Sequence, residues 1–419
     1  MQTVLGVTII VCVAVRDIKL NFPNSGDTHV CTIETLAYGG SGIARVDGLV
    51  VFVPDAIPGE SVRVRITQVK KNFARGTLVE VLEPSPDRIA PCCRVHGNVR
   101  VPGCVYDHLA YTAEVQAKQQ QLEGFFRRIP HAEDAFLPPV ASPAPLHYRN
   151  KITLHSDGSR LGYRQEPKHT VLDIPACPLA GPTINDALLG FRAHQQLKDG
   201  AKVMFRATPH DGAVWWTPQG ACSPDCPEHL TEQSPIGPLT VPHNGFYQVN
   251  PAVGDALVRF VMDTFAEDAH APDLLDLYCG VGVFGLACMK HGGRKLTGVE
   301  SGHAAVMTAR QNAKAHQVEG RFMVHLLGRE PLRLNDWMQA PRETTVITDP
   351  PREGMDKSTV QTLATSQAAR IFYISCDPAT LARDLAILLA GGNYRVSRVR
   401  LFDMFPRTAH FETVVELLA

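Results

Sequence analysis

The sequence predicts an α/β protein, with a doubly wound, mostly parallel sheet in the C-terminal part after a small β-barrel and a mixed α+β region. Three observations carry this prediction. From about residue 241 onward, uncharged strand-like runs alternate with helical runs, which is typical of a parallel sheet covered by helices. Between residues 31 and 82, short alternating strands are cut by glycine turns, as in a small antiparallel barrel. The length of 419 residues is enough for two or three domains.

A helical pattern from Tyr111 to Arg128 carries Leu122, Phe125 and Phe126 on one face. We expect this helix to pack on the C-terminal sheet, because prolines separate it from the segments on either side. The expected parts are an N-terminal extension (1–27), the barrel (28–86), a central domain (87–110 and 139–240) and the sheet domain (111–138 and 241–419).

The first 15 residues are apolar, but a membrane-spanning helix needs about 20, and no basic stretch precedes them. We expect an additional strand, or a start site assigned too early, rather than a targeting signal. No later run is long enough to span a membrane. We therefore expect no membrane partner.

Composition excludes several classes of protein. With 41 Lys and Arg against 42 Asp and Glu, any contact with nucleic acid must come from a local basic patch. The 11 cysteines show no regular disulfide framework, which favours a reducing compartment. We expect a cytoplasmic monomer.

A glycine-rich loop marks the first candidate ligand site. Gly280, Gly282 and Gly285 follow a buried strand and precede a helix, and Glu300 ends the next strand, twenty residues after Gly280. Such a loop holds a dinucleotide or S-adenosylmethionine, with the acid on ribose hydroxyls. Asp276 just before the loop favours S-adenosylmethionine, because a carboxylate would repel a pyrophosphate.

Two further strands end in polar residues that should reach the same crevice. Asp349 precedes Pro350 and Pro351, which force a rigid turn, and Arg352 follows where amino-group methyltransferases usually have an aromatic residue. Cys376 ends the next strand and precedes a helix, whose N-terminus could lower the pKa of the thiol. A cysteine beside two ligand loops is a candidate nucleophile. Near the C-terminus, Glu412 opens an apolar strand and is a candidate general base.

Together these motifs resemble the RNA uracil-5-methyltransferase family. The resemblance rests on "GFYQVNP", "DLYCGVGVFGL", "DPPREG", "ISCDPATLARDL" and "DMFPRTAHFETV". It implies a Rossmann-like class I S-adenosylmethionine methyltransferase fold, and "GGSGIARVDGLVVFVPDAIPGE" resembles the TRAM module, an RNA-binding barrel of the OB type.

The resemblance implies roles for residues at matching positions. Cys376 would add to carbon 6 of uracil and Glu412 would remove the proton from carbon 5. Arg352 would help to fix the base. The residues of the cofactor site would be Gln248, Tyr278, Gly280, Gly282, Glu300 and Asp349.

The expected RNA contacts are a local patch on the barrel, Lys70, Lys71, Phe73 and Arg75. The presence of the barrel favours 23S ribosomal RNA over transfer RNA. The alternatives are a transfer-RNA or cytosine-5 methyltransferase, or a homologue that binds RNA without catalysis.

Relatives that carry a four-iron, four-sulfur cluster hold it with four cysteines. The matching candidates here are Cys92, Cys93, Cys104 and Cys177. The remaining ligand position is taken by Val101, so the cluster motif is incomplete and the cluster is left open.

Overall fold

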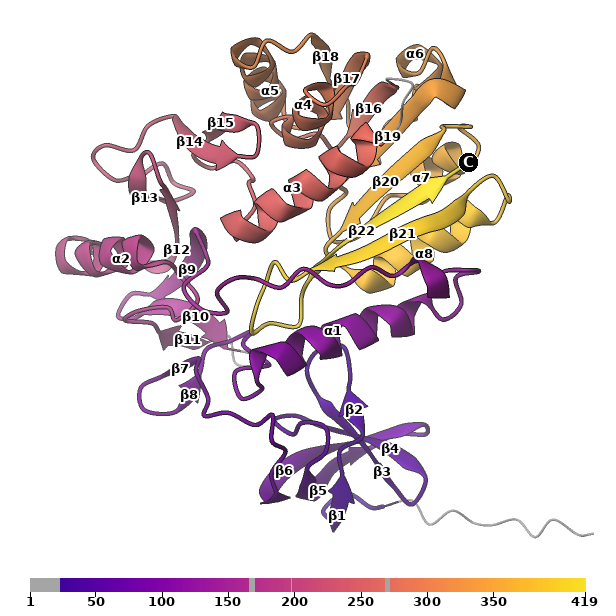
Figure 1. Ribbon diagram of the computed structural model, residues 1–419. Coiled ribbons are helices and arrows are strands. Elements are labelled where there is room, and N and C mark those ends of the chain that lie inside the picture. The colour runs from indigo at the N-terminus through magenta and orange to yellow at the C-terminus, as the bar shows by residue number, and fades with distance from the viewer. Residues whose placement is uncertain (1–22, 166–169, 197, 268–271) are drawn as a thin grey trace, which may run out of the picture. The chain divides into compact units, whose positions relative to one another are not determined.

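The computed structural model describes residues 23–165, 170–196, 198–267 and 272–419 (Figure 1). The expected extra strand in residues 1–27 falls almost wholly outside these described residues. By compactness the chain forms two units: one extends to Ser85 except for residues 38–40, and the other holds residues 38–40 and 86–419. In the described part of the chain, no helix is both long and apolar enough to cross a membrane.

The smaller unit is a six-stranded sheet in the order β1-β5-β6-β4-β3-β2. Its core holds alternate strand residues such as Val51, Val62 and Val64. The pairing differs from the expected antiparallel barrel at one place, because β4 pairs with β6 in parallel. The strands are β1 (Thr28–Thr32), β2 (Thr35–Leu36), β3 (Gly42–Val46), β4 (Leu49–Val53), β5 (Ser61–Val69) and β6 (Phe73–Glu83).

The larger unit contains a seven-stranded sheet in the order β18-β17-β16-β19-β20-β22-β21. Five strands are parallel, and β22 and β21 are antiparallel additions at one edge. This confirms the expected doubly wound α/β fold. The strands are β16 (Asp273–Leu277), β17 (Lys295–Glu300), β18 (Gly320–Val324), β19 (Thr344–Thr348), β20 (Arg370–Ser375), β21 (Arg395–Phe402) and β22 (Glu412–Leu418).

Alternate residues of these strands enter two separate cores. Leu275 and Tyr373 pack with α1, α7 and α8, whereas Leu274 and Phe372 pack with α3, α4 and α5. Leu122 and Phe126 bring the predicted helix α1 to the first of these cores. The helices are α1 (Tyr111–Phe126), α3 (Pro251–Ala266), α4 (Val283–Met289), α5 (His303–Ala315), α6 (Leu334–Trp337), α7 (Lys357–Ala364) and α8 (Pro378–Leu389), with 3-10 turns η1 (Glu133–Ala135) and η2 (Pro341–Glu343).

A second sheet of the larger unit is fully antiparallel, in the order β11-β10-β9-β12-β13. Helix α2 (Pro182–His194) covers one of its faces. The strands are β9 (Lys151–Asp157), β10 (Leu161–Gln165), β11 (Thr170–Asp173), β12 (Asp199–Thr208) and β13 (Gly212–Trp216), and two hairpins join β7 (Arg94–Val95) to β8 (Val99–Arg100) and β14 (His229–Ser234) to β15 (Gly237–Pro242).

Candidate active site

The glycine loop between β16 and α4 has the backbone geometry that its sequence predicts. Gly280 and Gly282 have φ values of +53° and +91°, which side chains rarely allow. Gly282 caps α4. Tyr278 also has a positive φ, of +59°, which is a strained conformation for an aromatic residue and is typical of functional sites.

Two carboxylates hold this loop. The Gly280 N–H donates to Glu300 Oε2 (3.1 Å), and the Gly285 N–H donates to Asp276 Oδ2 (3.0 Å). A Cβ at Gly285 would lie 2.9 Å from the Asp276 carboxylate, so only glycine lets α4 approach β16 this closely. Asp276 is therefore a buried residue that supports α4 and does not face a ligand. This differs from the expectation that its carboxylate would repel a pyrophosphate bound at the loop.

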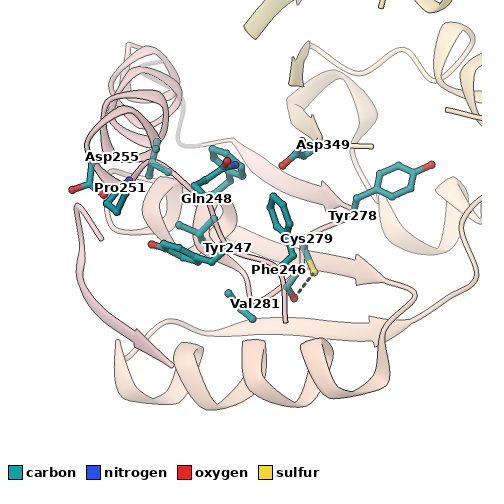
Figure 2. A pocket seen from close by; sticks show the side chains of 14 residues that line it. Phe246, Tyr247, Gln248, Pro251, Asp255, Tyr278, Cys279, Val281 and Asp349 are labelled. Atoms are coloured by element: carbon teal, nitrogen blue, oxygen red, sulfur yellow. Dashed lines mark hydrogen bonds between the residues drawn. The ribbon is translucent and has the colours of Figure 1, made fainter. Parts of the chain in front are cut away.

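A pocket of about 540 Å³, partly open to solvent, lies beside this loop. Its walls come from the glycine loop and the start of α4, from Asp349 after β19, and from α3 with the residues that join it to β15. Figure 2 shows Tyr278 and Asp349 on one side of it and Tyr247 and Gln248 on the other. The lining residues include the predicted cofactor residues Gln248, Tyr278, Gly280 and Asp349. Gly282 and Glu300 are not among its lining residues and act through the loop.

The pocket contains residues that sequence reasoning missed. Phe246 is 71% exposed although it is a large aromatic residue, and Asp255 of α3 also lines the pocket. A sequence pattern cannot reveal that the side chain of Phe246 is exposed. Its neighbour Gln248 was found only through the "GFYQVNP" motif.

The electrostatics of the pocket fit S-adenosylmethionine, which carries a sulfonium cation. None of the lining residues is Lys or Arg. Burial raises the pKa of Asp349 to about 7 and that of the neighbouring Asp276 to about 8. Carboxyls with such raised pKa values are stabilised by a nearby positive charge. A dinucleotide would bring an anionic pyrophosphate to Asp255 and Asp349, the carboxyls that line the pocket, so these two residues fit the cationic cofactor.

Cys376 and Glu412 meet at one end of a strand pair. Ser375, the last residue of β20, pairs with Thr413 of β22. Cys376 follows Ser375 and Glu412 precedes Thr413, so both residues lie next to the last recorded pair of this ladder. The charge of Glu412 raises the pKa of Cys376, so the two side chains lie within electrostatic range of each other. The register thus brings the predicted nucleophile and base together.

The free thiol of Cys376 is protonated at neutral pH. Burial and the charges of Glu412 and Asp349 raise its pKa to about 12, while Arg352, which hydrogen-bonds the thiol, opposes them. At the start of α8, the Asp377 side chain accepts hydrogen bonds from the Ala379 and Thr380 N–H groups. The expectation of a lowered pKa was therefore wrong.

Asp349 joins the two halves of the site. It lines the cofactor pocket, and its charge raises the pKa of both Cys376 and Glu412. Glu412 is buried, and burial raises its pKa well above the usual range. The guanidinium of Arg352 is the opposing cation for both groups.

The loop before Glu412 is held by a buried ionic network. The Lys118 ammonium of α1 donates to Asp403 (2.7 Å) and to Glu114 (2.8 Å), and all three side chains are fully buried. Arg407 adds a third link, from its backbone N–H to Glu114 (2.7 Å). Asp403 belongs to the "DMFPRTAHFETV" motif, but the sequence gives no signal of its partners on α1.

Comparisons with known proteins agree with this geometry. Residues 239–419 match the family model for tRNA (uracil-5-)-methyltransferase, and residues 25–79 match that for the TRAM domain. The 23S rRNA (uracil(1939)-C(5))-methyltransferase of Acidithiobacillus ferrooxidans is 32% identical, over 91% of this chain and 95% of the relative. The chain belongs to the RNA uracil-5-methyltransferase family. It is an S-adenosylmethionine-dependent RNA methyltransferase, as the sequence predicts.

Other members of the family differ in the RNA that their names give. The tRNA (uracil(54)-C(5))-methyltransferase of Schizosaccharomyces pombe is 30% identical, over 92% of this chain and 77% of the relative. The fold matches the Pyrococcus abyssi tRNA (uracil-54, C5)-methyltransferase, whose crystal structure contains S-adenosyl-L-homocysteine. The TM-score is 0.71 at 24% identity, and the match covers 93% of this chain and 99% of that one.

The described residues give no support for an iron–sulfur cage at the four candidate cluster cysteines. Cys92, Cys93 and Cys104 form a chain of hydrogen-bonded thiols, while the Cys177 thiol lies 3.3 Å from the Tyr163 hydroxyl. Throughout the described ranges, no group of three or more His, Cys, Asp or Glu side chains could hold a metal ion. The structure therefore does not support the cluster.

The predicted RNA patch lies at the turn between β5 and β6. Lys70, Lys71 and Arg75 are exposed. Phe73 is half-buried, since its ring packs edge-on against Phe52 with 5.6 Å between centroids. The three charges are available to a phosphate backbone, whereas most of the Phe73 ring is engaged in packing.

Proposed function

We propose that this enzyme methylates carbon 5 of a uridine in 23S ribosomal RNA, with Cys376 as nucleophile and Glu412 as general base. The observation that supports the proposal is the pairing of Ser375 with Thr413, because Cys376 and Glu412 are the residues next to this pair. Asp349 supports it because the same carboxylate faces the cofactor pocket and influences both groups.

The chemistry needs a nucleophile and a base on one uracil. Carbon 5 is a poor nucleophile until the Cys376 thiolate adds to carbon 6 and moves electron density to carbon 5. S-adenosylmethionine supplies the methyl group and a positive charge when it is bound. Glu412 then takes the proton from carbon 5, and the bond from Cys376 to carbon 6 breaks to release the product and the thiolate.

The protonation states of the free protein set a requirement for this series of reaction steps. The Cys376 thiol has a pKa of about 12 in the free protein, and the pKa of Glu412 is raised well above its usual range, so both groups must lose their protons to water when the substrates are bound. The positive charge of the cofactor beside Asp349 offsets the negative potential that holds the proton on sulfur. Arg352 acts in the same direction, and we propose that it also contacts the uracil ring.

We also propose that the glycine loop and the residues around it bind S-adenosylmethionine. Gln248, Tyr278 and Asp349 would contact the cofactor directly, since they line the pocket. Glu300 would act on the ribose while it holds the Gly280 N–H. Gly282 would set the start of α4, whose free N–H groups face the loop.

The RNA substrate is the finer part of the proposal. The target uridine must leave its stack to reach Cys376, and Lys70, Lys71, Phe73 and Arg75 would bind the flanking backbone. The 32% identity with a 23S rRNA methyltransferase and the TRAM module favour ribosomal RNA. Transfer RNA is the second candidate, because the yeast relative named for it is 30% identical.

We also propose that the chain has the four parts expected from its sequence. The enzyme would be a cytoplasmic monomer. Residues 111–138 and 241–419 would form the catalytic domain. The packing of Leu122 and Phe126 on the large sheet supports the inclusion of α1.

The test uses purified protein, methyl-labelled S-adenosylmethionine, and two unmodified transcripts, one of 23S rRNA and one of transfer RNA. Label should appear as 5-methyluridine at one position of the 23S transcript. Label in the transfer RNA alone would reassign the substrate, and label in 5-methylcytidine would overturn the reaction.

A further inference from the structure

The antiparallel sheet of the larger unit has two different faces. Ile152 and Leu154 of β9 enter the apolar core beneath α2. The register places Lys202 opposite His155 and Arg206 opposite Lys151, so these residues share the other face. That face holds Lys151, Thr153 and His155 of β9, Lys202, Met204 and Arg206 of β12, and Trp216 of β13.

A pocket of about 1080 Å³, partly open to solvent, lies on this second face. It is separate from the cofactor pocket, and no role has been given to it above. The residues that carry its chemistry are Lys151, Thr153, Lys202, Trp216, His243 and Asn244. It therefore combines two ammonium groups with an aromatic wall and hydrogen-bonding side chains.

The charge of this face is positive. Glu232 is the neighbouring carboxylate, and it forms its ion pair with Arg206 (2.6 Å). Lys151 instead donates to the Gly245 carbonyl oxygen (3.2 Å), with its Nζ 5.5 Å from the centroid of the Trp216 ring. Burial and the charge of Arg206 lower the pKa of Lys151 to about 8.

The positive electrostatic potential of this face extends along the sheet to His155. Burial and the charges of Arg164 and Lys202 lower the pKa of His155. The carboxylate at the end of β9, Asp157, is bonded to Arg160 (2.6 Å). A surplus of cations in a pocket with a lowered lysine pKa is a site for an anion.

A short segment connects this pocket to the cofactor pocket. His243 and Asn244 line the basic pocket, while Phe246 and Gln248 line the cofactor pocket. Between them, the Gly245 carbonyl oxygen accepts hydrogen bonds from both Lys151 and Arg206 (3.2 Å each). The segment 243–248 therefore contributes to both pockets, and Lys151 and Arg206 hold it at Gly245.

We propose that this pocket binds the sugar–phosphate backbone of the substrate RNA beside the target uridine, with Lys151 and Lys202 on its phosphates. Asn244 and His243 are placed to donate to the neighbouring ribose or base edge. The inference rests on the proposed RNA methylation and names a second part of its substrate site.

The experiment compares Lys151→Met and Lys202→Met with Lys314→Met, which removes an exposed lysine of α5. Affinity for a 23S rRNA transcript is measured over a series of KCl concentrations. Each pocket variant should bind roughly fivefold more weakly, and the slope of log affinity against log salt should fall by about 0.7–0.9, because one phosphate contact is lost. Lys314→Met should match the wild type.

Two controls separate binding from folding. Affinity for S-adenosylhomocysteine should stay unchanged in every variant, which shows that the segment carrying Gln248 is intact. Lys151→Arg should retain most of the RNA affinity, because it keeps the charge.

The inference is overturned if both pocket variants keep the wild-type affinity and salt slope. If they keep those values while the wild type forms 5-methyluridine, only the pocket assignment fails. If they lose affinity but the wild type forms no 5-methyluridine, the RNA site stands and the proposed reaction fails.

Discussion

Cys376 and Glu412 lie at adjoining ends of two paired strands, one position beyond the pair of Ser375 with Thr413. The charge of Glu412 is the largest influence on the Cys376 pKa after burial. Glu412 is the first residue of β22, and Cys376 directly follows the last paired residue of β20.

Glu412→Gln should separate the addition of the nucleophile from its release. The amide cannot take the proton from carbon 5, so we expect turnover to fall by about 10²–10⁴-fold. RNA should remain linked to Cys376 in denaturing gels when cofactor is present. A variant that turns over at the wild-type rate, or that forms no linked species, would contradict the role of Glu412.

The alkylation rate of Cys376 measures its ionisation directly. Because its pKa is about 12, the rate should rise about tenfold per pH unit from pH 7 to pH 10 without a plateau. Arg352→Gln should slow the reaction by removing the opposing cation, and Glu412→Gln should speed it. Iodoacetamide labelling followed by peptide mass spectrometry provides the rates, with exposed Cys222 as internal reference. A plateau near pH 8 would refute the assigned pKa.

Lys118→Met should destabilise the protein strongly. It removes the cation between Asp403 and Glu114, which are fully buried, and an unpaired buried charge costs about 3–5 kcal/mol. Urea unfolding measures the loss, with exposed Lys357→Met as the matched control. Equal stability of the two variants would mean that the buried network contributes nothing to folding.

Asp276→Asn should change how stability depends on pH. The pKa of Asp276 is raised to about 8 from about 3.9 in the unfolded chain, so the folded state holds this proton more tightly. Its contribution to stability is therefore full below about pH 4 and is lost as pH rises to about 8.

Asn keeps an acceptor for the Gly285 N–H but cannot ionise. The stability of Asp276→Asn relative to the wild type should thus increase with pH between 4 and 8, by at most about 1.4 kcal/mol per pH unit. Thermal unfolding at several pH values checks this. A difference that stays constant with pH would contradict the raised pKa.

The sequence predicts the positions of the glycine loop and of Cys376 at strand ends, because a recognisable turn follows each strand. Gly282 and Cys376 are found by local pattern alone. The face of the sheet to which the Asp276 side chain points depends on its position along β16, because successive strand residues point to opposite faces. A shift of one residue in the expected register of this strand would reverse that direction. The raised pKa of Cys376 depends on Glu412 and Asp349, which come from distant parts of the chain, so local pattern suggested the opposite shift.

Other features depend on contacts that sequence periodicity does not encode. The parallel pairing of β4 with β6 joins strands that look like any antiparallel neighbours. Lys118 reads as a solvated helix residue, although α1 buries it completely. The basic face of the second sheet becomes visible only when the register aligns Lys151 with Arg206.

The most direct test of the account uses RNA in which 5-fluorouridine replaces uridine. Fluorine on carbon 5 cannot be removed as a proton, so a methylated adduct should remain attached to the protein. Mass spectrometry after trypsin should find the nucleotide on the peptide of residues 371–383, at the sulfur of Cys376. No adduct, or an adduct on another residue such as Cys279, would contradict the central claim.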